Sequence, residues 1–415
     1  MTRLTEPRSD VTELPDLASR RLGGSVIAAS DELFAEKENL IKPEAPVFAP
    51  GEFGNRGKIY DGWETRRRRE PGHDHAVVRL GVPGIVHGVV VDTSFFRGNY
   101  PPQVSVEALG AEGYPSPGEL AAMTWHTLVS RTDARGDAVN IYPVADRRRW
   151  THVRLSVYPD GGVARFRVHG TTVADPRFLA GTVDLAAAEN GGRLIGCSDD
   201  FYSSAGNLIL PSRAAGMGEG WENARRRGPG HDYVVIALAA AGKLRHVEID
   251  TSWFVGNAPG WVRLLAADAR AAPAGPAAEP GPAAEPGPAA EPGPPGPGAE
   301  PGPAPEPGPA GEPDPPGPGS PWREVLSLTR VQPDTRHRFL IAGVPVATHV
   351  RLDVIPDGGL ARLRINGDIV PEALAGLRER WWDALPEAQR DDIRRVSASD
   401  PPVLAPNPRI GLADH

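Results

Sequence analysis

Short apolar runs rich in valine and isoleucine alternate along this chain with glycine, proline and aspartate. This pattern is typical of β-strands separated by turns. Six such runs follow one another in the first part of the chain: His75–Leu80, Ile85–Asp92, Gln103–Ala108, Trp125–Ser130, Thr151–Tyr158 and Val163–Val168. The Pro-Asp-Gly-Gly sequence at 159–162 predicts a hairpin turn between the last two. Because no long helical pattern separates the runs, the series favours an antiparallel sandwich or jelly roll over a parallel α/β sheet.

The whole pattern occurs twice, which indicates two tandem β-sandwich domains. The matching segments are Gly23–Asp31 with Gly191–Asp199, Gly62–Asp74 with Gly220–Asp232, Asp92–Asn99 with Asp250–Asn257, and Thr151–Gly162 with Thr348–Gly359. The last pair is spaced further apart than the others, because the second copy carries extra residues between Asp268 and Pro321.

These extra residues are reiterated Gly-Pro-Ala-Ala-Glu-Pro blocks. Proline at this density removes amide donors, so the segment cannot join a sheet and is expected to be an extended, solvated loop. Glycine returns every six residues rather than every three, which gives no support to a collagen triple helix. We interpret the segment as an expanded surface loop, with a partner-binding role as the alternative.

The repeats divide the chain into four parts: an N-terminal tail (1–15), repeat 1 (16–184), repeat 2 (185–370, with the low-complexity insertion at about 268–321) and a C-terminal helix and tail (371–415). A helix is predicted after Pro371, where leucine and tryptophan recur at helical spacing. The residues from Ser397 are expected to be irregular.

Composition excludes several classes of protein. The 45 basic and 53 acidic residues give a net charge of −8, so no global positive field would gather nucleic acid or an anionic bilayer. No apolar run approaches the ~20 residues of a membrane span, and the amino terminus lacks the apolar stretch of a signal peptide. The single cysteine, Cys197, excludes an internal disulfide framework. We therefore expect a cytoplasmic protein in which Cys197 is a small buried apolar residue.

The first candidate cluster lies between Asp61 and Asp74, where acids, cations and an imidazole are crowded. Its candidate residues are Trp63, Glu64, Arg66, His73 and Asp74, together with His231 of the second copy. Adjacent residues of a strand point to opposite faces, so His73 and Asp74 share a pocket only if the preceding Pro-Gly turns the chain. The alternative is a solvated charged loop whose arginines pair with Glu64 and Glu70.

The second candidate cluster follows the apolar run that ends at Asp92, where a strand end would support binding groups rigidly. Its candidate residues are Asp92, Ser94, Arg97 and Asn99, together with Asp250 of the second copy. Arg97 could hold a carboxylate in a bidentate fork. Repeat 2 has Val255 at this position, so substrate chemistry is expected mainly on repeat 1. The alternative is that Asp-Thr-Ser only ties the strand end to its own backbone. A third pair, His152 and His349, is interpreted as structural.

The sequence from Asp16 through Ala108 resembles the allantoicase family, on the stretches DLASRRLGGSVIAASDELFAEKENLIKPE, FGNRGKIYDGWETRRRR, PGHD and VDTSFFRGNYPP. The second half matches through GWENARRRGPGHD, IDTSWFVGN, VQPDTRHRF and THVRLDVIPDGG, so the resemblance covers nearly all of residues 16–370. It implies tandem jelly-roll domains similar to galactose-binding modules. It also implies a hydrolase of linear amidines that converts allantoate to ureidoglycolate and urea in allantoin and purine degradation.

Allantoate carries one carboxylate and two ureido groups on one carbon, so its site needs a cation and hydrogen-bond acceptors. We assign Arg97 or Arg66 to the carboxylate, Glu64 and Asp92 to the ureido groups, and His73 to proton transfer. A divalent ion such as manganese and a homo-oligomer are both left open by the sequence. Two other functions stay as alternatives, a noncatalytic carbohydrate-binding protein and a hydrolase of ureidoglycolate or a related ureido compound.

Overall fold

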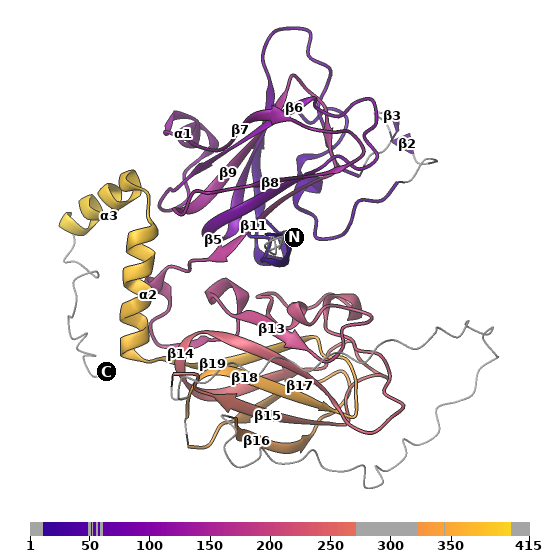
Figure 1. Ribbon diagram of the computed structural model, residues 1–415, viewed down its shortest axis with the longest axis vertical. Coiled ribbons are helices and arrows are strands. Elements are labelled where there is room, and N and C mark those ends of the chain that lie inside the picture. The colour runs from indigo at the N-terminus through magenta and orange to yellow at the C-terminus, as the bar shows by residue number, and fades with distance from the viewer. Residues whose placement is uncertain are drawn as a thin grey trace, which may run out of the picture.

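The chain forms two β-sandwiches stacked along its long axis, with short helices around them (Figure 1). This computed structural model describes residues 11–48, 51, 53–54, 57–58, 61–270, 322–343 and 345–399. The predicted all-β architecture with two tandem domains is confirmed. The predicted proline-rich loop and both predicted terminal tails fall largely outside the described residues.

Repeat 1 contains a larger and a smaller sheet that share one strand. The larger sheet has the order β1 (Ser25–Ala29), β5 (Asp74–Asp92), β9 (Arg149–Tyr158), β6 (Gln103–Leu109) and β7 (His126–Asp133). The second half of β5 pairs with β8 (Val139–Pro143) and β11 (Arg165–Thr172) to form the smaller sheet. All of these pairings are antiparallel, as the alternating sequence pattern predicts.

The prediction of two separate strands at His75–Leu80 and Ile85–Asp92 is wrong, because β5 is one continuous strand of 19 residues. Its register with β9 shifts between Arg79 and Gly84, where the strand passes from one sheet to the other. At Gly84 a Cβ atom would lie 2.3 Å from the Thr171 carbonyl oxygen, so only glycine allows this close passage.

Repeat 2 has the same topology. Its larger sheet has the order β13 (Arg193–Cys197), β14 (Asp232–Asp250), β18 (Val346–Ile355), β15 (Trp261–Ala267) and β16 (Arg323–Arg330). The second half of β14 pairs with β17 (Arg336–Leu340) and β19 (Arg362–Ile369), and β12 (Thr182–Asp184) adds to β19.

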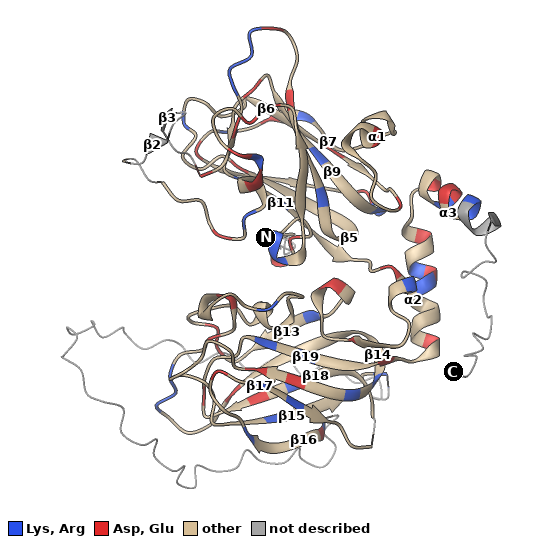
Figure 2. Cartoon of the chain, turned by 180° about the vertical axis from the view of Figure 1, so that it is seen from behind, with Lys and Arg blue, Asp and Glu red and all other residues tan. Residues whose placement is uncertain are grey.

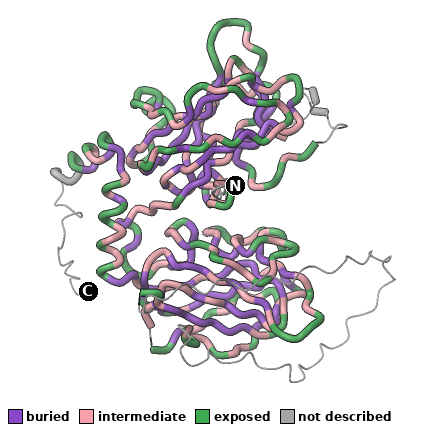
Figure 3. The backbone as a smooth tube through the Cα atoms, in the orientation of Figure 1, coloured by how far each residue is buried: buried purple, intermediate pink, exposed green. Residues whose placement is uncertain are grey.

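Buried residues follow the strands of both sandwiches, while the connecting loops are exposed (Figure 3). Fully buried aromatic residues anchor equivalent positions of the two repeats, Trp63 and Phe96 in repeat 1 and Trp221 and Phe254 in repeat 2. Burial of each large apolar side chain contributes about 1.5–3 kcal/mol to folding. The duplicated core therefore holds the polar loops of each repeat in equivalent positions.

Short elements complete each sandwich. They are the strands β2 (Phe53–Gly54), β3 (Gly57–Lys58), β4 (Trp63–Glu64) and β10 (Gly162–Val163), and the 3-10 helices Val11–Glu13, Arg20–Leu22, Lys37–Ile41, Pro176–Phe178, Ala188–Asn190, Ala205–Ile209 and Met217–Glu219. β4 pairs with β10 at one end of the sandwich of repeat 1.

The C-terminal helices return the chain to repeat 1. α2 (Pro371–Ala384) is the predicted helix, and a second helix, α3 (Glu387–Ser399), follows it. Trp381 packs with Leu385, and Gln389 is fully buried and donates a hydrogen bond of 2.6 Å to Glu112. These contacts hold the C-terminal helices against the sandwich of repeat 1. α1 (Pro117–Ala122) lies between β6 and β7, where no helix is predicted from the sequence.

None of the helices in the described segments is long and apolar enough to cross a membrane. Cys197 is half-buried rather than buried, and burial raises the pKa of its thiol to about 11.

Candidate functional site

Four loops of repeat 1 meet at the end of the sandwich where β5 begins. The segments follow β1 (Ser30–Asp31), follow β4 (Thr65–Glu70), begin β5 (Asp74) and form the β9–β10 turn (Asp160). They surround a cavity of about 880 Å³ lined by Ser30, Asp31, Leu33, Phe34, Arg66, Arg67, Arg68, Arg69, Glu70 and Asp74. Figure 2 shows the run of basic residues along one side of a loop that projects from repeat 1. We call this set the arginine cavity.

A buried carboxylate fixes one wall of the arginine cavity. Asp74 is only 2% exposed, and its Oδ1 accepts hydrogen bonds from Ser30 Oγ at 2.9 Å and Arg68 Nη1 at 2.8 Å. The Arg68 amide in turn donates to Asp160 Oδ2 at 2.8 Å. Asp74 Oδ2 is buried and has no hydrogen-bond partner among the described residues, so its capacity to accept a hydrogen bond is unused there.

A second carboxylate, Asp31, holds the start of the arginine run. Its oxygens accept from the Arg66 amide at 2.7 Å and from Arg66 Nε at 2.6 Å. Burial opposes the ionisation of Asp31, but hydrogen bonds from Arg66 and Leu33 outweigh it and lower the pKa of this carboxyl. The Asp31 carbonyl accepts from Trp63 Nε1 at 2.8 Å, and Trp63 is fully buried. The structure therefore gives Trp63 a packing role beneath the loop.

Glu64 is placed between the two clusters named from the sequence. It is 8% exposed, and its Oε1 accepts a hydrogen bond of 2.6 Å from Asn99 Nδ2. Its Oε2 has no partner among the described residues. Burial raises the pKa of Glu64, although the hydrogen bond from Asn99 opposes this shift. Glu64 does not line the arginine cavity itself, but it directly precedes the loop that does.

The other candidate side chains of the second cluster make local contacts outside the arginine cavity. Asp92 Oδ1 accepts a hydrogen bond of 2.8 Å from the Ser94 amide, and Asp250 accepts the equivalent bond of 2.9 Å from Ser252. This is the strand-end contact that the alternative interpretation predicts. Arg97 is 81% exposed in its side chain and pairs with Asp137 at 2.9 Å. Neither Asp92 nor Arg97 lines the arginine cavity.

His73 also lies outside the arginine cavity. It is exposed, and its ring centroid lies 4.8 Å from that of Tyr158 and 6.3 Å from that of His75. The strand geometry therefore separates His73 from its neighbour Asp74, which points inward.

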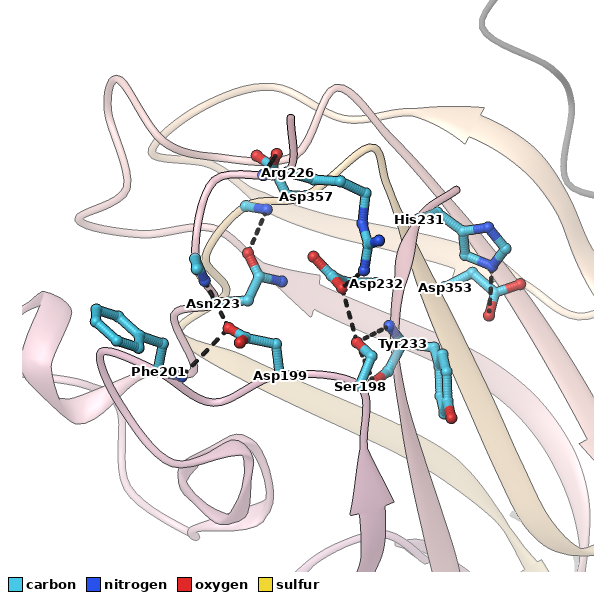
Figure 4. Close-up of polar contacts among 12 residues, drawn as sticks. Ser198, Asp199, Phe201, Asn223, Arg226, His231, Asp232, Tyr233, Asp353 and Asp357 are labelled. Atoms are coloured by element: carbon cyan, nitrogen blue, oxygen red, sulfur yellow. Dashed lines mark hydrogen bonds and ion pairs between the residues drawn. The ribbon is translucent and has the colours of Figure 1, made fainter. Parts of the chain in front are cut away.

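Repeat 2 reproduces the scaffold with different chemistry (Figure 4). Ser198 donates to Asp232 at 2.9 Å, Arg226 pairs with Asp232, and the Arg226 amide donates to Asp357 at 2.6 Å. Ala224 occupies the position of Arg66, so Asp199 accepts only backbone amides at that place, including that of Ala224 at 2.6 Å. One cation of the loop is therefore missing from the second copy.

His231 differs from its counterpart in repeat 1. Its Nε2 lies 3.4 Å from Asp353 Oδ1 (Figure 4). Asp353 is fully buried and also binds Arg263 at 2.7 Å and Arg351 at 2.6 Å. Ser156 takes the place of Asp353 in repeat 1. His231 thus lies next to a buried aspartate–arginine ion network on the sheet of repeat 2.

The sequence interpretation missed four residues that build the site, Ser30, Asp31, Arg68 and Asp160. A signal was present, because Ser-Asp at 30–31 returns at 198–199 and the aspartate of Pro-Asp-Gly-Gly returns at 357. In the described part of the chain, no three side chains of histidine, cysteine, aspartate or glutamate are grouped as a metal site.

Comparison with known proteins agrees with the duplicated scaffold. The family model of the allantoicase repeat matches residues 15–173 and again residues 183–370. The chain belongs to the allantoicase family. A probable allantoicase from Nocardia farcinica is 50% identical over 362 residues, which cover 86% of this chain and 95% of that protein. A probable allantoicase from Streptomyces coelicolor is 43% identical over 383 residues, 89% of each chain.

The crystal structure of an allantoicase from Saccharomyces cerevisiae shares the architecture. It aligns with a TM-score of 0.65 at 30% identity and covers 86% of this chain and 93% of that one. A second solved allantoicase structure gives the same TM-score at 31% identity, over 85% of this chain and 92% of that one. Family membership therefore extends across both sandwiches.

Proposed function

We propose that this member of the allantoicase family hydrolyses allantoate to ureidoglycolate and urea, as a step of allantoin degradation in the cytoplasm. The observation that carries the proposal is the arginine cavity, which combines four guanidinium groups with a buried carboxylate oxygen that has no partner within the described segments. This combination matches a small molecule with one carboxylate and several N–H donors.

The substrate carboxylate is bound by the arginine run. Arg66 keeps its terminal nitrogens available because its Nε is the atom that binds Asp31, and its side chain remains largely exposed to the cavity. A planar guanidinium binds a carboxylate through two parallel hydrogen bonds. The ureido N–H groups then donate to Asp74, which also lines the cavity and whose Oδ2 has no partner among the described residues. Arg68 and Ser30 hold Asp74 in this orientation.

Expulsion of urea requires a proton on the leaving nitrogen as the carbon–nitrogen bond breaks. Glu64 is our candidate for this donor, because burial raises its pKa and it directly precedes the loop that lines the cavity. Since Glu64 does not line the cavity in this structure, the loop must move for its carboxyl to reach a bound substrate. Asn99 holds the carboxyl through Oε1, and the buried Oε2 has no partner among the described residues. His73 stays a prediction for proton transfer, and a metal-activated water stays an alternative that a chelator can test.

The proposal assigns catalysis to repeat 1, since repeat 2 has Ala224 and Val255 where repeat 1 has Arg66 and Arg97. The proposal includes no nucleic-acid or membrane partner. A homo-oligomer stays a prediction, which sedimentation analysis can test.

Repeat 2 supplies matched substitutions for the experiment. We expect Arg66→Ala, which introduces the residue of repeat 2, to lower kcat/KM for allantoate by about 10- to 100-fold, the loss typical of a charged hydrogen bond. Arg97→Val, the equivalent change in the second cluster, is expected to leave the rate nearly unchanged. Urea release from allantoate is measured colorimetrically, with and without chelator and added manganese.

The same assay separates the other functions. No urea from allantoate under any of these conditions would contradict the proposal, and turnover of ureidoglycolate alone would favour the related hydrolase. A loss of activity in Arg97→Val but not in Arg66→Ala would move the substrate carboxylate to the second cluster.

A further inference from the structure

A second cavity lies at the opposite end of repeat 1 from the arginine cavity. β9 runs from Arg149 to Tyr158, next to the turn that carries Asp160. At about 3.3 Å per residue, the two ends of this strand are roughly 30 Å apart. The cavity has a volume of about 520 Å³. Its repeat 1 walls are the part of β5 that passes between the two sheets, the start of β9, the loop before α1 and the linker after β11. The first helical turn of repeat 2 completes the lining. The cavity therefore lies between the two repeats.

Arg149 lines this cavity without a direct carboxylate partner among the described residues, although Asp175 and Glu112 stabilise its charge through space. The residue is only 4% exposed, and its Nε donates to the Val173 carbonyl at 2.8 Å. Its terminal nitrogens have no hydrogen-bond partner in the described part of the chain. The nearby carboxylates Glu112 and Asp175 are instead bound by Arg177, at 2.6 Å and 2.9 Å. Burial lowers the pKa of Arg149 to about 10, which still leaves it charged at neutral pH.

His152 offers an acceptor to the same cavity. Thr151 Oγ1 lies 3.0 Å from the Leu109 carbonyl and 2.8 Å from His152 Nδ1, and we assign the tautomer in which the hydroxyl donates to the carbonyl and accepts from Nδ1. The other ring nitrogen, Nε2, is therefore an acceptor. Burial lowers the pKa of His152 to about 4, and the positive charge of Arg79 adds to this effect, so the ring stays neutral. The carboxylate of Glu189 also lines the cavity.

We propose that this cavity is a second, noncatalytic binding site for a small carboxylate that also carries an N–H donor, as an amino acid or a ureido acid does. The ligand carboxylate binds the terminal nitrogens of Arg149, and its N–H group donates to His152 Nε2 or Glu189. A buried guanidinium whose terminal nitrogens lack hydrogen-bond partners is costly, and Asp175 and Glu112 act on Arg149 only through space, so an anionic ligand would supply the missing hydrogen bonds. The proposal does not depend on catalysis at the arginine cavity.

Repeat 2 has no equivalent site. When the strand registers of the two repeats are compared, Val346 occupies the position of Arg149 and Ala237 occupies that of Arg79. His349 takes the position of His152, so the histidine is retained. Valine is thus compatible with this position of the fold. The asymmetry assigns the second site to repeat 1 alone.

The test is calorimetric titration of the full chain in the Arg68→Met background, which weakens binding at the arginine cavity. The probes are hydantoate (a ureido acid), glycine and acetate at constant ionic strength. We expect hydantoate or glycine to bind at about one equivalent, and acetate, which lacks the N–H donor, to bind at least about tenfold more weakly. Arg149→Val is expected to weaken hydantoate binding at least about tenfold, the value of one charged hydrogen bond. Arg245→Val, a change of an exposed arginine of repeat 2, is the control and should have no effect.

Binding of hydantoate alone would assign the site to ureido acids, and binding of glycine as well would assign it to the wider amino-acid class. Equal binding in Arg149→Val and its parent, equal binding of acetate and hydantoate, or no binding of either N–H probe would overturn the proposal. If Arg149→Val fails to fold, Ala174→Phe fills the cavity from its wall without removing the charge and must abolish the same binding.

Discussion

The contact between Arg68 and Asp74 allows stability and catalysis to be separated by one pair of substitutions. Arg68→Met removes the 2.8 Å hydrogen bond to Asp74 and leaves this buried carboxylate with Ser30 as its only described side-chain donor. Removal of one partner of a fully buried ion pair costs about 3–5 kcal/mol. Arg68 keeps 28% of its side-chain surface exposed, so solvent screens the loss, and we expect about 1–3 kcal/mol.

Repeat 2 provides the control, because Arg226 pairs with Asp232 at similar exposure. Arg226→Met is therefore expected to lower the free energy of unfolding by a similar amount, measured by guanidinium denaturation with a double-mutant cycle against Asp74→Asn or Asp232→Asn. Only the repeat 1 variant is expected to lose allantoate turnover, by about 100-fold or more if both the position of Asp74 and its charge are disturbed.

Two results would refute this reasoning. Equal loss of turnover in Arg68→Met and Arg226→Met would show that both repeats contribute to catalysis. A coupling energy near zero between Arg68 and Asp74 would show that the contact does not hold the carboxylate in place.

Three further predictions follow from the contacts described. Glu64→Gln should abolish turnover. Burial raises the pKa of Glu64 in the folded protein. The contribution of Glu64 to stability is therefore present below its unfolded pKa and is lost as pH rises through its folded pKa. Thermal unfolding of Glu64→Gln should lack this pH dependence. His73→Ala tests proton transfer directly, and full activity would remove His73 from the mechanism. Gln389→Leu leaves Glu112 without one hydrogen bond and should lower the free energy of unfolding by about 1–2 kcal/mol, whereas Arg395→Leu on the exposed side of α3 should change it little.

Much of the fold can be predicted from the sequence because the information is local. Alternating apolar positions and Pro-Asp-Gly-Gly turns predict the strands, and the duplication predicts two domains. The continuity of β5 cannot be predicted in this way, since Gly81 and Gly84 interrupt the apolar pattern where the strand crosses between sheets. α3 is also difficult to predict, because its sequence is mostly polar and its anchor is a contact between Gln389 and distant Glu112.

The candidate site can be predicted only in part from the sequence, for a similar reason. Arg66 and Asp74 are recognisable as a dense charged segment, and both line the cavity. Asp92 looks equivalent in the sequence, yet its carboxylate is used by its own strand end. Asp74 Oδ1 is held by Ser30, which lies 44 residues earlier in the chain, whereas Asp92 Oδ1 is held by the amide two residues further on. A distinction of this kind requires the tertiary structure.

The docking of Gln389 on Glu112 sets an order of events during synthesis. Domains generally fold as units while the chain leaves the ribosome, starting from the N-terminal one. The sandwich of repeat 1 can form early, but its surface around Glu112 stays uncovered until the whole of repeat 2 and both C-terminal helices have been translated. A ribosome stalled within repeat 2 would therefore carry a nascent chain whose first sandwich is folded but still lacks its final cover.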